Sequence, residues 1–120
     1  MMKKLFAIAI PILPGKSQQF KKFIAELNGS RYNDFTKSRK KLSVHERTFF
    51  QSTPNGDLVI VTLEGSDPAA AFKLFGESKD DFSNWFAKQV QEIHGIDLKT
   101  PPQGPMPELI VDTMEEILQS

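Results

Sequence analysis

The residues of this chain best suited to chemistry are an arginine, a glutamate and a histidine within one stretch of predicted sheet. Arg47 and Glu64 are the strongest pair, because a guanidinium can bind an anionic or enolate oxygen while a carboxylate beside it transfers a proton. His45 is the alternative base, since an imidazole titrates near neutral pH. The same arginine and glutamate can equally form a cross-strand ion pair that only stabilises the sheet, and His45 can be a solvated strand end. The residue types leave both interpretations open.

A predicted β-hairpin brings these side chains together. Residues 44–53 and 58–64 form its two strands, and Asn55 with Gly56 between them is typical of a type I′ turn, whose two central residues have positive φ. This turn predicts four cross-strand pairs: Thr53 with Leu58, Gln51 with Ile60, Phe49 with Thr62, and Arg47 with Glu64. Because side chains alternate along a strand, one face then carries His45, Arg47, Phe49, Gln51, Ile60, Thr62 and Glu64. The opposite face, with Val44, Thr48, Phe50, Val59, Val61 and Leu63 and with Glu46 near its end, is expected to pack under helices.

The chain before the hairpin predicts one strand and two helices. Residues 5–13 are apolar on both alternating faces, which is typical of a central strand covered on both sides. Ser17 is the expected N-cap of a helix with apolar residues at Phe20, Phe23, Ile24 and Leu27, and Asn28 with Gly29 predicts a left-handed end. A weaker helix begins at Ser30, carries Tyr32, Phe35 and Leu42, and includes a basic run at 37–41.

The chain after the hairpin predicts two more helices and a last strand. Asp67 and Pro68 supply an N-cap and a first-turn proline, and Gly76 is expected to end that helix. Ser78 and Asp81 resemble a capping box before an apolar stripe of Phe82, Trp85, Phe86, Val90 and Ile93, which ends at Gly95 with His94 in the last turn. Residues 99–107 hold four prolines and predict an extended connection to a short strand at 109–111.

Composition excludes several classes of function. Fifteen basic and fifteen acidic residues give a net charge of zero, so we expect neither nucleic acid nor a membrane surface as partner. The absence of cysteine excludes disulfides and thiolate chemistry, and two histidines are too few for a histidine-rich metal site. We therefore predict no metal and no cofactor. The apolar run at 5–13 imitates a signal peptide but lacks a small-residue cleavage site, so a cytoplasmic protein is expected.

The order of elements predicts a fold class. A β-α-β-β-α-β chain of 120 residues is expected to form a single ferredoxin-like α+β domain, 1–120, with helices on one face of a four-stranded antiparallel sheet. The other face would be partly apolar and exposed to water, and a second subunit packed against it would cover it. We therefore expect a homodimer.

Several sequence strings carry a resemblance to a known family. They are Glu-Arg-Thr-Phe-Phe-Gln at 46–51 before a Gly-Asp turn, Pro-Asn-Gly-Asp-Leu-Val-Ile-Val at 54–61, Asp-Pro-Ala-Ala-Ala-Phe at 67–72 and Glu-Ile-His-Gly-Ile-Asp at 92–97. With these strings and its element order, the chain resembles the dimeric α+β barrel superfamily, and most of all small uncharacterised members related to antibiotic-biosynthesis-type monooxygenases. The resemblance implies subunits packed sheet on sheet around a ligand cavity.

The resemblance implies a range of activities rather than one. Relatives include cofactor-independent quinone-forming monooxygenases, haem-degrading enzymes, muconolactone-type isomerases and stress-response proteins, so the fold does not choose a function. Haem-degrading relatives carry a tryptophan on a strand and an asparagine on the first strand. This chain places Trp85 in a predicted helix and has no asparagine in its first strand, which argues against that chemistry.

Two functional hypotheses follow. In the first, a homodimer binds a small aromatic or enolisable molecule in a cavity between sheet and helices, lined by Arg47, Glu64, His45, Phe49, Gln51 and Thr62, with Ile60 beside them, and with Arg31 and Tyr32 as a lid. A cofactor-independent monooxygenase or isomerase would then use Arg47 to steady an enolate and Glu64 or His45 as base. In the second, a non-catalytic dimeric binding or stress-associated module uses the polar side chains only to set the dimer register.

Overall fold

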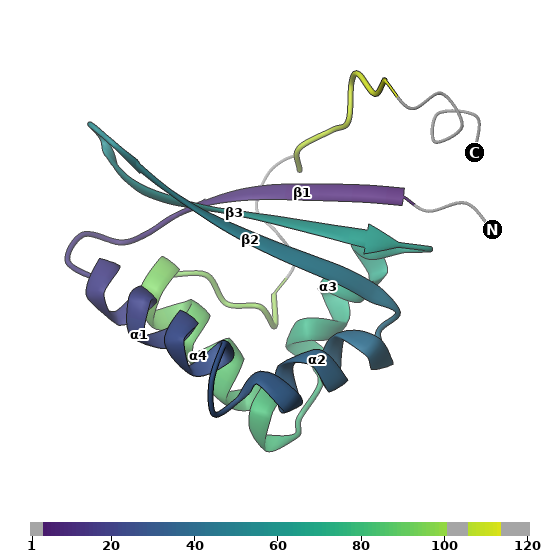
Figure 1. Cartoon of the computed structure of the whole chain (residues 1–120), viewed down its shortest axis with the longest axis horizontal. Coiled ribbons are helices and arrows are strands. Elements are labelled where there is room, and N and C mark those ends of the chain that lie inside the picture. The colour runs from purple at the N-terminus through teal and green to yellow at the C-terminus, as the bar shows by residue number, and fades with distance from the viewer. Residues whose placement is uncertain (1–3, 101–105, 114–120) are drawn as a thin grey trace.

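A mixed α+β arrangement positions the candidate residues (Figure 1). The computed structural model describes residues 4–100 and 106–113. Its elements are β1 (Lys4–Pro11), α1 (Ser17–Leu27), α2 (Tyr32–Lys41), β2 (Val44–Thr53), β3 (Gly56–Gly65), α3 (Pro68–Glu77) and α4 (Asp81–His94). The three strands form an antiparallel sheet in the order β1-β3-β2. All four helices of the described residues lie on one side of this sheet, and within residues 4–100 and 106–113 its other face carries no helix (Figure 1).

The predicted fourth strand is not confirmed. Residues 109–111 have no regular secondary structure, and the side chains of Ile110 and Val111 are 80% and 74% exposed. The described sheet therefore has three strands. Most of the predicted proline-rich connection, residues 101–105, lies outside the described residues.

The hairpin register differs from the prediction by two residues. Thr53 pairs with Gly56, Gln51 with Leu58, Phe49 with Ile60, Arg47 with Thr62, and His45 with Glu64. The turn lies at Pro54 and Asn55, because the fixed φ of proline suits the second position of a turn and Asn55 does not adopt the positive φ of a type I′ turn. Thr53 Oγ1 closes the turn by donating to the Gly56 carbonyl (2.6 Å) and accepting from the Asn55 amide (3.2 Å). A shift of two residues keeps every side chain on its predicted face.

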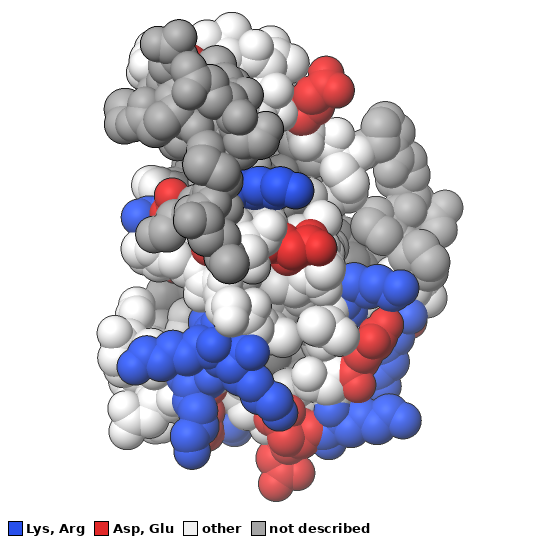
Figure 2. Space-filling view, turned by 90° about the vertical axis from the view of Figure 1, so that its right-hand side faces the viewer, with Lys and Arg blue, Asp and Glu red and all other residues white. Residues whose placement is uncertain are grey.

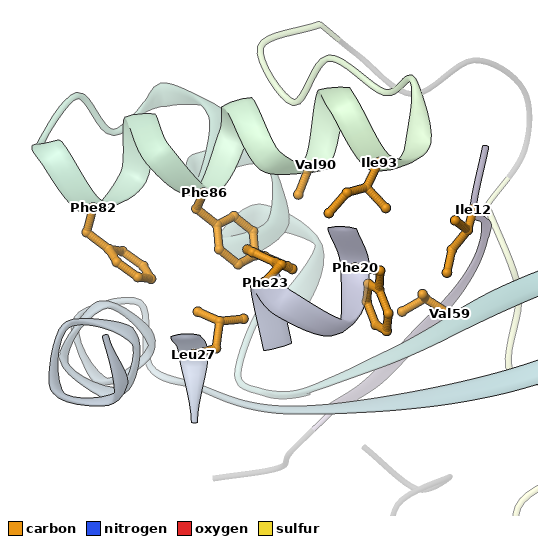
Figure 3. Close-up of a cluster of buried hydrophobic side chains, with 9 residues drawn as sticks. All are labelled: Ile12, Phe20, Phe23, Leu27, Val59, Phe82, Phe86, Val90 and Ile93. Carbon is orange, nitrogen blue, oxygen red and sulfur yellow. The ribbon is translucent and has the colours of Figure 1, made fainter. Parts of the chain in front are cut away.

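The helix-facing side of the sheet contributes to the core as predicted. Val44, Val59 and Leu63 are buried there, and Val61 packs against both core clusters. Phe20 and Phe23 of α1 meet Phe86 of α4 in the larger of these clusters, which also contains Ile12, Leu27, Val59, Phe82, Val90 and Ile93 (Figure 3). The predicted apolar stripes of α1 and α4 are thus the surfaces that meet.

Several predicted helix ends are wrong in detail, and the N-cap of α2 is Arg31 instead of Ser30. Ser17 is the first helical residue instead of the N-cap, and its hydroxyl donates to Asp57 Oδ2 of β3. Asn28 ends α1 in the right-handed region. Ser78 follows the last residue of α3 and its amide bonds to Leu74, so the α4 cap is Asp80, which accepts from the Ser83 amide at 3.1 Å. The predicted ends at Asp67 and Gly95 are confirmed.

Gly76 lies within α3 instead of ending it. The helix continues to Glu77, and a Cβ atom at position 76 would lie 1.9 Å from the Leu98 carbonyl oxygen. The glycine therefore permits a close approach between α3 and the segment after α4.

Candidate functional site

Arg47, Glu64 and His45 come together on the face of the sheet that the helices leave uncovered. Arg47 Nη1 lies 3.3 Å from Glu64 Oε1, and His45 Nδ1 lies 4.0 Å from the same oxygen. His45 is directly opposite Glu64, whereas Arg47 reaches it diagonally from the position opposite Thr62. The side chains of His45, Arg47 and Glu64 are 62%, 47% and 28% exposed. Ion pairs with this exposure contribute little to stability.

The other predicted ligand-binding residues share this uncovered face. Phe49 is 53% exposed, Gln51 is exposed, and Ile60 and Thr62 of the central strand are half-buried. The prediction that these side chains line a cavity between sheet and helices is wrong for most of them. The odd-numbered residues of β2 and the even-numbered residues of β3 share one face of the sheet. Because side chains alternate along a strand, this face points away from the helices.

A cleft lies on the other side of β2, beside α1 and α2. Its volume is about 510 Å³, and the aromatic residues that line it are Phe20, Tyr32, Phe35, Phe49 and Phe50. Of the predicted site residues, His45 and Phe49 border it. Phe50 stacks on Phe20 at 5.8 Å between ring centroids and remains 42% exposed, which shows that helix packing leaves this part of β2 open.

A buried ion pair forms part of the cleft wall. Arg39 Nε of α2 donates to Glu46 Oε1 of β2 at 2.6 Å, and the two side chains are only 8% and 6% exposed. The second carboxylate oxygen has one long contact, 3.4 Å from Thr48 Oγ1. Charged groups at this depth are stable only when paired, so the arginine and the glutamate depend on each other.

Aromatic rings surround the guanidinium of Arg39. Its Cζ lies 3.9 Å from the ring centroid of Phe75, 4.7 Å from Phe86 and 5.0 Å from Phe35. Nη1 donates to Ser38 Oγ at 3.0 Å, and Nη2 is buried without a hydrogen-bond partner among the described residues. Cation–π attraction from three rings supports a charge that hydrogen bonds only partly satisfy.

A smaller pocket lies between the helices and the sheet. Its volume is about 60 Å³, and it shares Phe20, Ile24, Leu27, Glu46 and Thr48 with the cleft. Among these shared residues Glu46 is the charged one. Glu46 therefore borders both the cleft and the smaller pocket.

His94 borders the smaller pocket and bonds to a neighbouring element. Its Nδ1 lies 2.8 Å from the Pro11 carbonyl oxygen at the end of β1, which makes the ring nitrogen the donor. Burial lowers the pKa of His94, and the bond to Pro11 opposes that effect. The neutral imidazole is therefore favoured, although a helix end would favour the charged form.

The basic run at 37–41 lies toward the end of α2. Arg39, Lys40 and Lys41 occupy the last turn, where cations interact favourably with the helix dipole. Figure 2 shows Lys and Arg side chains with Asp and Glu side chains among them on the face in view. Charges of both signs therefore share this face.

Neither a metal-binding cluster nor a membrane-spanning helix occurs in the described part of the chain. In residues 4–100 and 106–113, no three His, Cys, Asp or Glu side chains gather closely enough to hold a metal ion. No helix within these ranges is long and apolar enough to cross a membrane.

Comparison with known proteins identifies no relative. No family model matches the chain, and no curated protein or solved structure matches it significantly. The geometry of the cleft and of the sheet must therefore support any functional assignment.

The sequence prediction missed the Arg39–Glu46 pair, although a signal was present. Glu46 is a carboxylate on the strand face predicted to pack under helices, and a buried charge requires a partner. Arg39 belongs to the basic run at 37–41, a pattern typical of a solvated helix end. Only the packing of α2 against β2 distinguishes Arg39 from its lysine neighbours.

Proposed function

We propose that this protein binds a small, mainly apolar and aromatic molecule in the cleft between α1, α2 and β2. The cleft carries this proposal, because a volume of about 510 Å³ lies within the range of small-molecule sites and because aromatic side chains line it around one buried ion pair. Apolar walls with a few polar groups are the usual composition of such sites.

Side chains at the mouth of the cleft support this role. Tyr32 and Phe50 both line the cleft and are 51% and 42% exposed. A bound aromatic molecule would remove part of this apolar surface from water, which is the main source of affinity for such ligands. Tyr32 is thus the residue that we expect to cover the ligand.

We further propose a homodimer built on the uncovered sheet face, in a ferredoxin-like fold with 109–111 as the fourth strand. Leu5, Ala9 and Phe49 are exposed on that face, and β1 lies at an edge of the described sheet, where a further strand can pair. These features agree with the resemblance to dimeric α+β barrels.

The polar side chains of the uncovered face have two proposed roles. In a non-catalytic dimer, the pair of Arg47 and Glu64 would set the register of two facing sheets, and its distance of 3.3 Å on an open face favours this role. In a cofactor-independent monooxygenase or isomerase, the same pair with His45 would act on a ligand held between the sheets. The cleft residues Arg39 and Glu46 serve binding in either case.

Native mass spectrometry of the purified protein tests the ligand and the dimer together. We expect a dimer with an additional mass of a few hundred daltons that is lost on denaturation. A bare dimer would shift the assignment to the non-catalytic module, and a monomer would contradict the sheet-on-sheet dimer.

A cleft-filling variant tests the site itself. Ile24 lines the cleft, whereas its neighbour Ala25 is exposed. We expect Ile24→Trp to weaken binding of 2-naphthol, measured by calorimetry, by at least about tenfold, since the indole occupies the ligand volume. Ala25→Trp is the matched control and should bind as the parent protein does. Equal binding by both variants would place the ligand elsewhere.

A further inference from the structure

Glu46 is the charged residue that borders both the cleft and the smaller pocket behind it. We infer that the Glu46 carboxylate accepts a hydrogen bond from the ligand, so the ligand class is a neutral aromatic molecule that carries a hydroxyl or N–H donor, such as a phenol. This inference rests on the proposed function, because it specifies what the cleft selects.

The carboxylate of Glu46 has capacity for such a bond. An ionised carboxylate offers about four acceptor sites on its two oxygens. Arg39 Nε uses one site on Oε1 at 2.6 Å, and among the described residues the hydrogen-bond partner of Oε2 is Thr48 Oγ1, at 3.4 Å. Oε2 therefore remains an underused acceptor on a side chain that is only 6% exposed.

The charge balance of the site favours a neutral donor. Arg39 compensates the charge of Glu46, so the pair as a whole is neutral. An anionic ligand would bring a second negative charge to the carboxylate, which is unfavourable at this burial. An apolar ligand without a donor would exclude water from Oε2 and offer no hydrogen bond in return.

The surrounding side chains define the shape of the ligand. Phe20 and Phe50 stack with 17° between their planes on one side of the cleft, and Phe35 lies at another part of the wall. Flat ring faces of this kind complement a planar ligand. A planar body with a donor at the end nearest Glu46 satisfies both the rings and the carboxylate.

Two probes of matched shape test the inference on the unmodified protein. 2-Naphthol has the donor, and 2-methoxynaphthalene has the same ring system with the donor replaced by an ether. We expect calorimetric titration to give binding of 2-naphthol that is at least about tenfold tighter, because a hydrogen bond to a charged acceptor is lost with the ether.

A pair of variants assigns the preference to Glu46. Glu46→Gln removes the charge at nearly constant volume and should reduce the ratio of the two affinities to about one to threefold. Glu77→Gln on the exposed surface of α3 is the control and should keep the ratio of the unmodified protein.

The outcomes separate this inference from the proposed function. Tight and equal binding of both probes would overturn the role of Glu46 and leave the cleft as a binding site. Failure of both probes to bind would overturn both. A preference that persists in Glu46→Gln would assign donor recognition to a different acceptor. If Glu46→Gln does not fold, the comparison of the two probes on the unmodified protein still decides whether the site selects a donor.

Discussion

Two arginine–glutamate pairs, one between α2 and β2 and one within the hairpin, differ sharply in their physical setting. Arg39 and Glu46 are almost fully buried under aromatic rings, whereas Arg47 and Glu64 lie on an open face. The first pair has lost its hydration and depends on its own contacts, while water still solvates the second. The same two residue types therefore contribute differently to stability in the two pairs.

Truncation of each arginine measures this difference. Arg39→Ala should reduce the free energy of unfolding by about 3–5 kcal/mol, since it leaves Glu46 buried and unpaired. Arg47→Ala should change it by less than about 1 kcal/mol, as for other exposed pairs. Urea unfolding followed by circular dichroism measures both, and similar losses in the two variants would contradict this account.

His94 gives the protein a dependence on pH just below neutrality. Burial lowers its pKa in the folded state below the ordinary value of 6.5. The unfolded chain then binds a proton more readily than the folded one, so stability is complete above that value and decreases as the pH falls through it. Between about pH 7.5 and 5.5 we expect the free energy of unfolding to decrease, and His94→Gln should flatten this slope.

A control and a second titration separate this effect from others. His45→Gln removes a histidine from the exposed sheet face and should keep the slope. Hydrogen bonds from Ser17 and Ser52 lower the pKa of Asp57, and bonds from Ser83 lower that of Asp80. The stability that these two carboxylates contribute is lost only below about pH 4, outside the tested window. A slope that persists in His94→Gln would assign the dependence to a different group.

At the scale of elements, close contacts decide where helices lie. The sequence predicts Gly76 as a helix end, but the residue allows α3 to touch the carbonyl of Leu98. Pro54 likewise moves the hairpin turn by one residue and the register by two. The role of Gly76 depends on the segment that packs against it, whereas Pro54 acts through its own fixed φ.

A side chain at position 76 should push α3 away from the segment that contains Leu98. Gly76→Ala would gain helix propensity but place a methyl group against a backbone carbonyl, so we expect a net loss of about 1–3 kcal/mol. Lys73→Ala, at an exposed position of α3, should change stability by less than about 0.5 kcal/mol. Thermal or urea unfolding measures both, and a stabilised Gly76→Ala variant would show that α3 does not approach Leu98.

At the scale of the whole molecule, the sheet has one covered and one uncovered face (Figure 1). Helices bury the apolar side chains of the first face in two clusters. The second face mixes exposed apolar residues with the pair of Arg47 and Glu64. This asymmetry is the physical basis of the proposed dimer.

A charge on the uncovered face tests that dimer. Ala9 is exposed there, and Ala69 is exposed on α3 away from the sheet face. Ala9→Glu should convert dimers to monomers without loss of the folded state, because two facing sheets would bury a repelling pair of carboxylates. Ala69→Glu should remain dimeric. Light scattering after size-exclusion chromatography gives the mass, and a dimeric Ala9→Glu variant would exclude this face as the interface.

The sequence alone determined which side chains share a face. Alternation in the strands and the 3.6-residue period in α1 and α4 are local properties, so the residues that point to the core could be predicted. His45, Arg47 and Glu64 share a face because of the same alternation. They do so even though the predicted register is wrong by two residues.

Tertiary structure alone decided where the cleft lies and which charged residues border it. The distance between α2 and β2 leaves about 510 Å³ open and brings Arg39 to Glu46 across seven residues of chain. Neither the volume of the cleft nor the pairing of Arg39 with Glu46 follows from the periodicity of the sequence, because both depend on how several side chains pack at once. A run of basic residues is therefore typical of a solvated surface. Only the packing shows that one of them is buried beside a carboxylate.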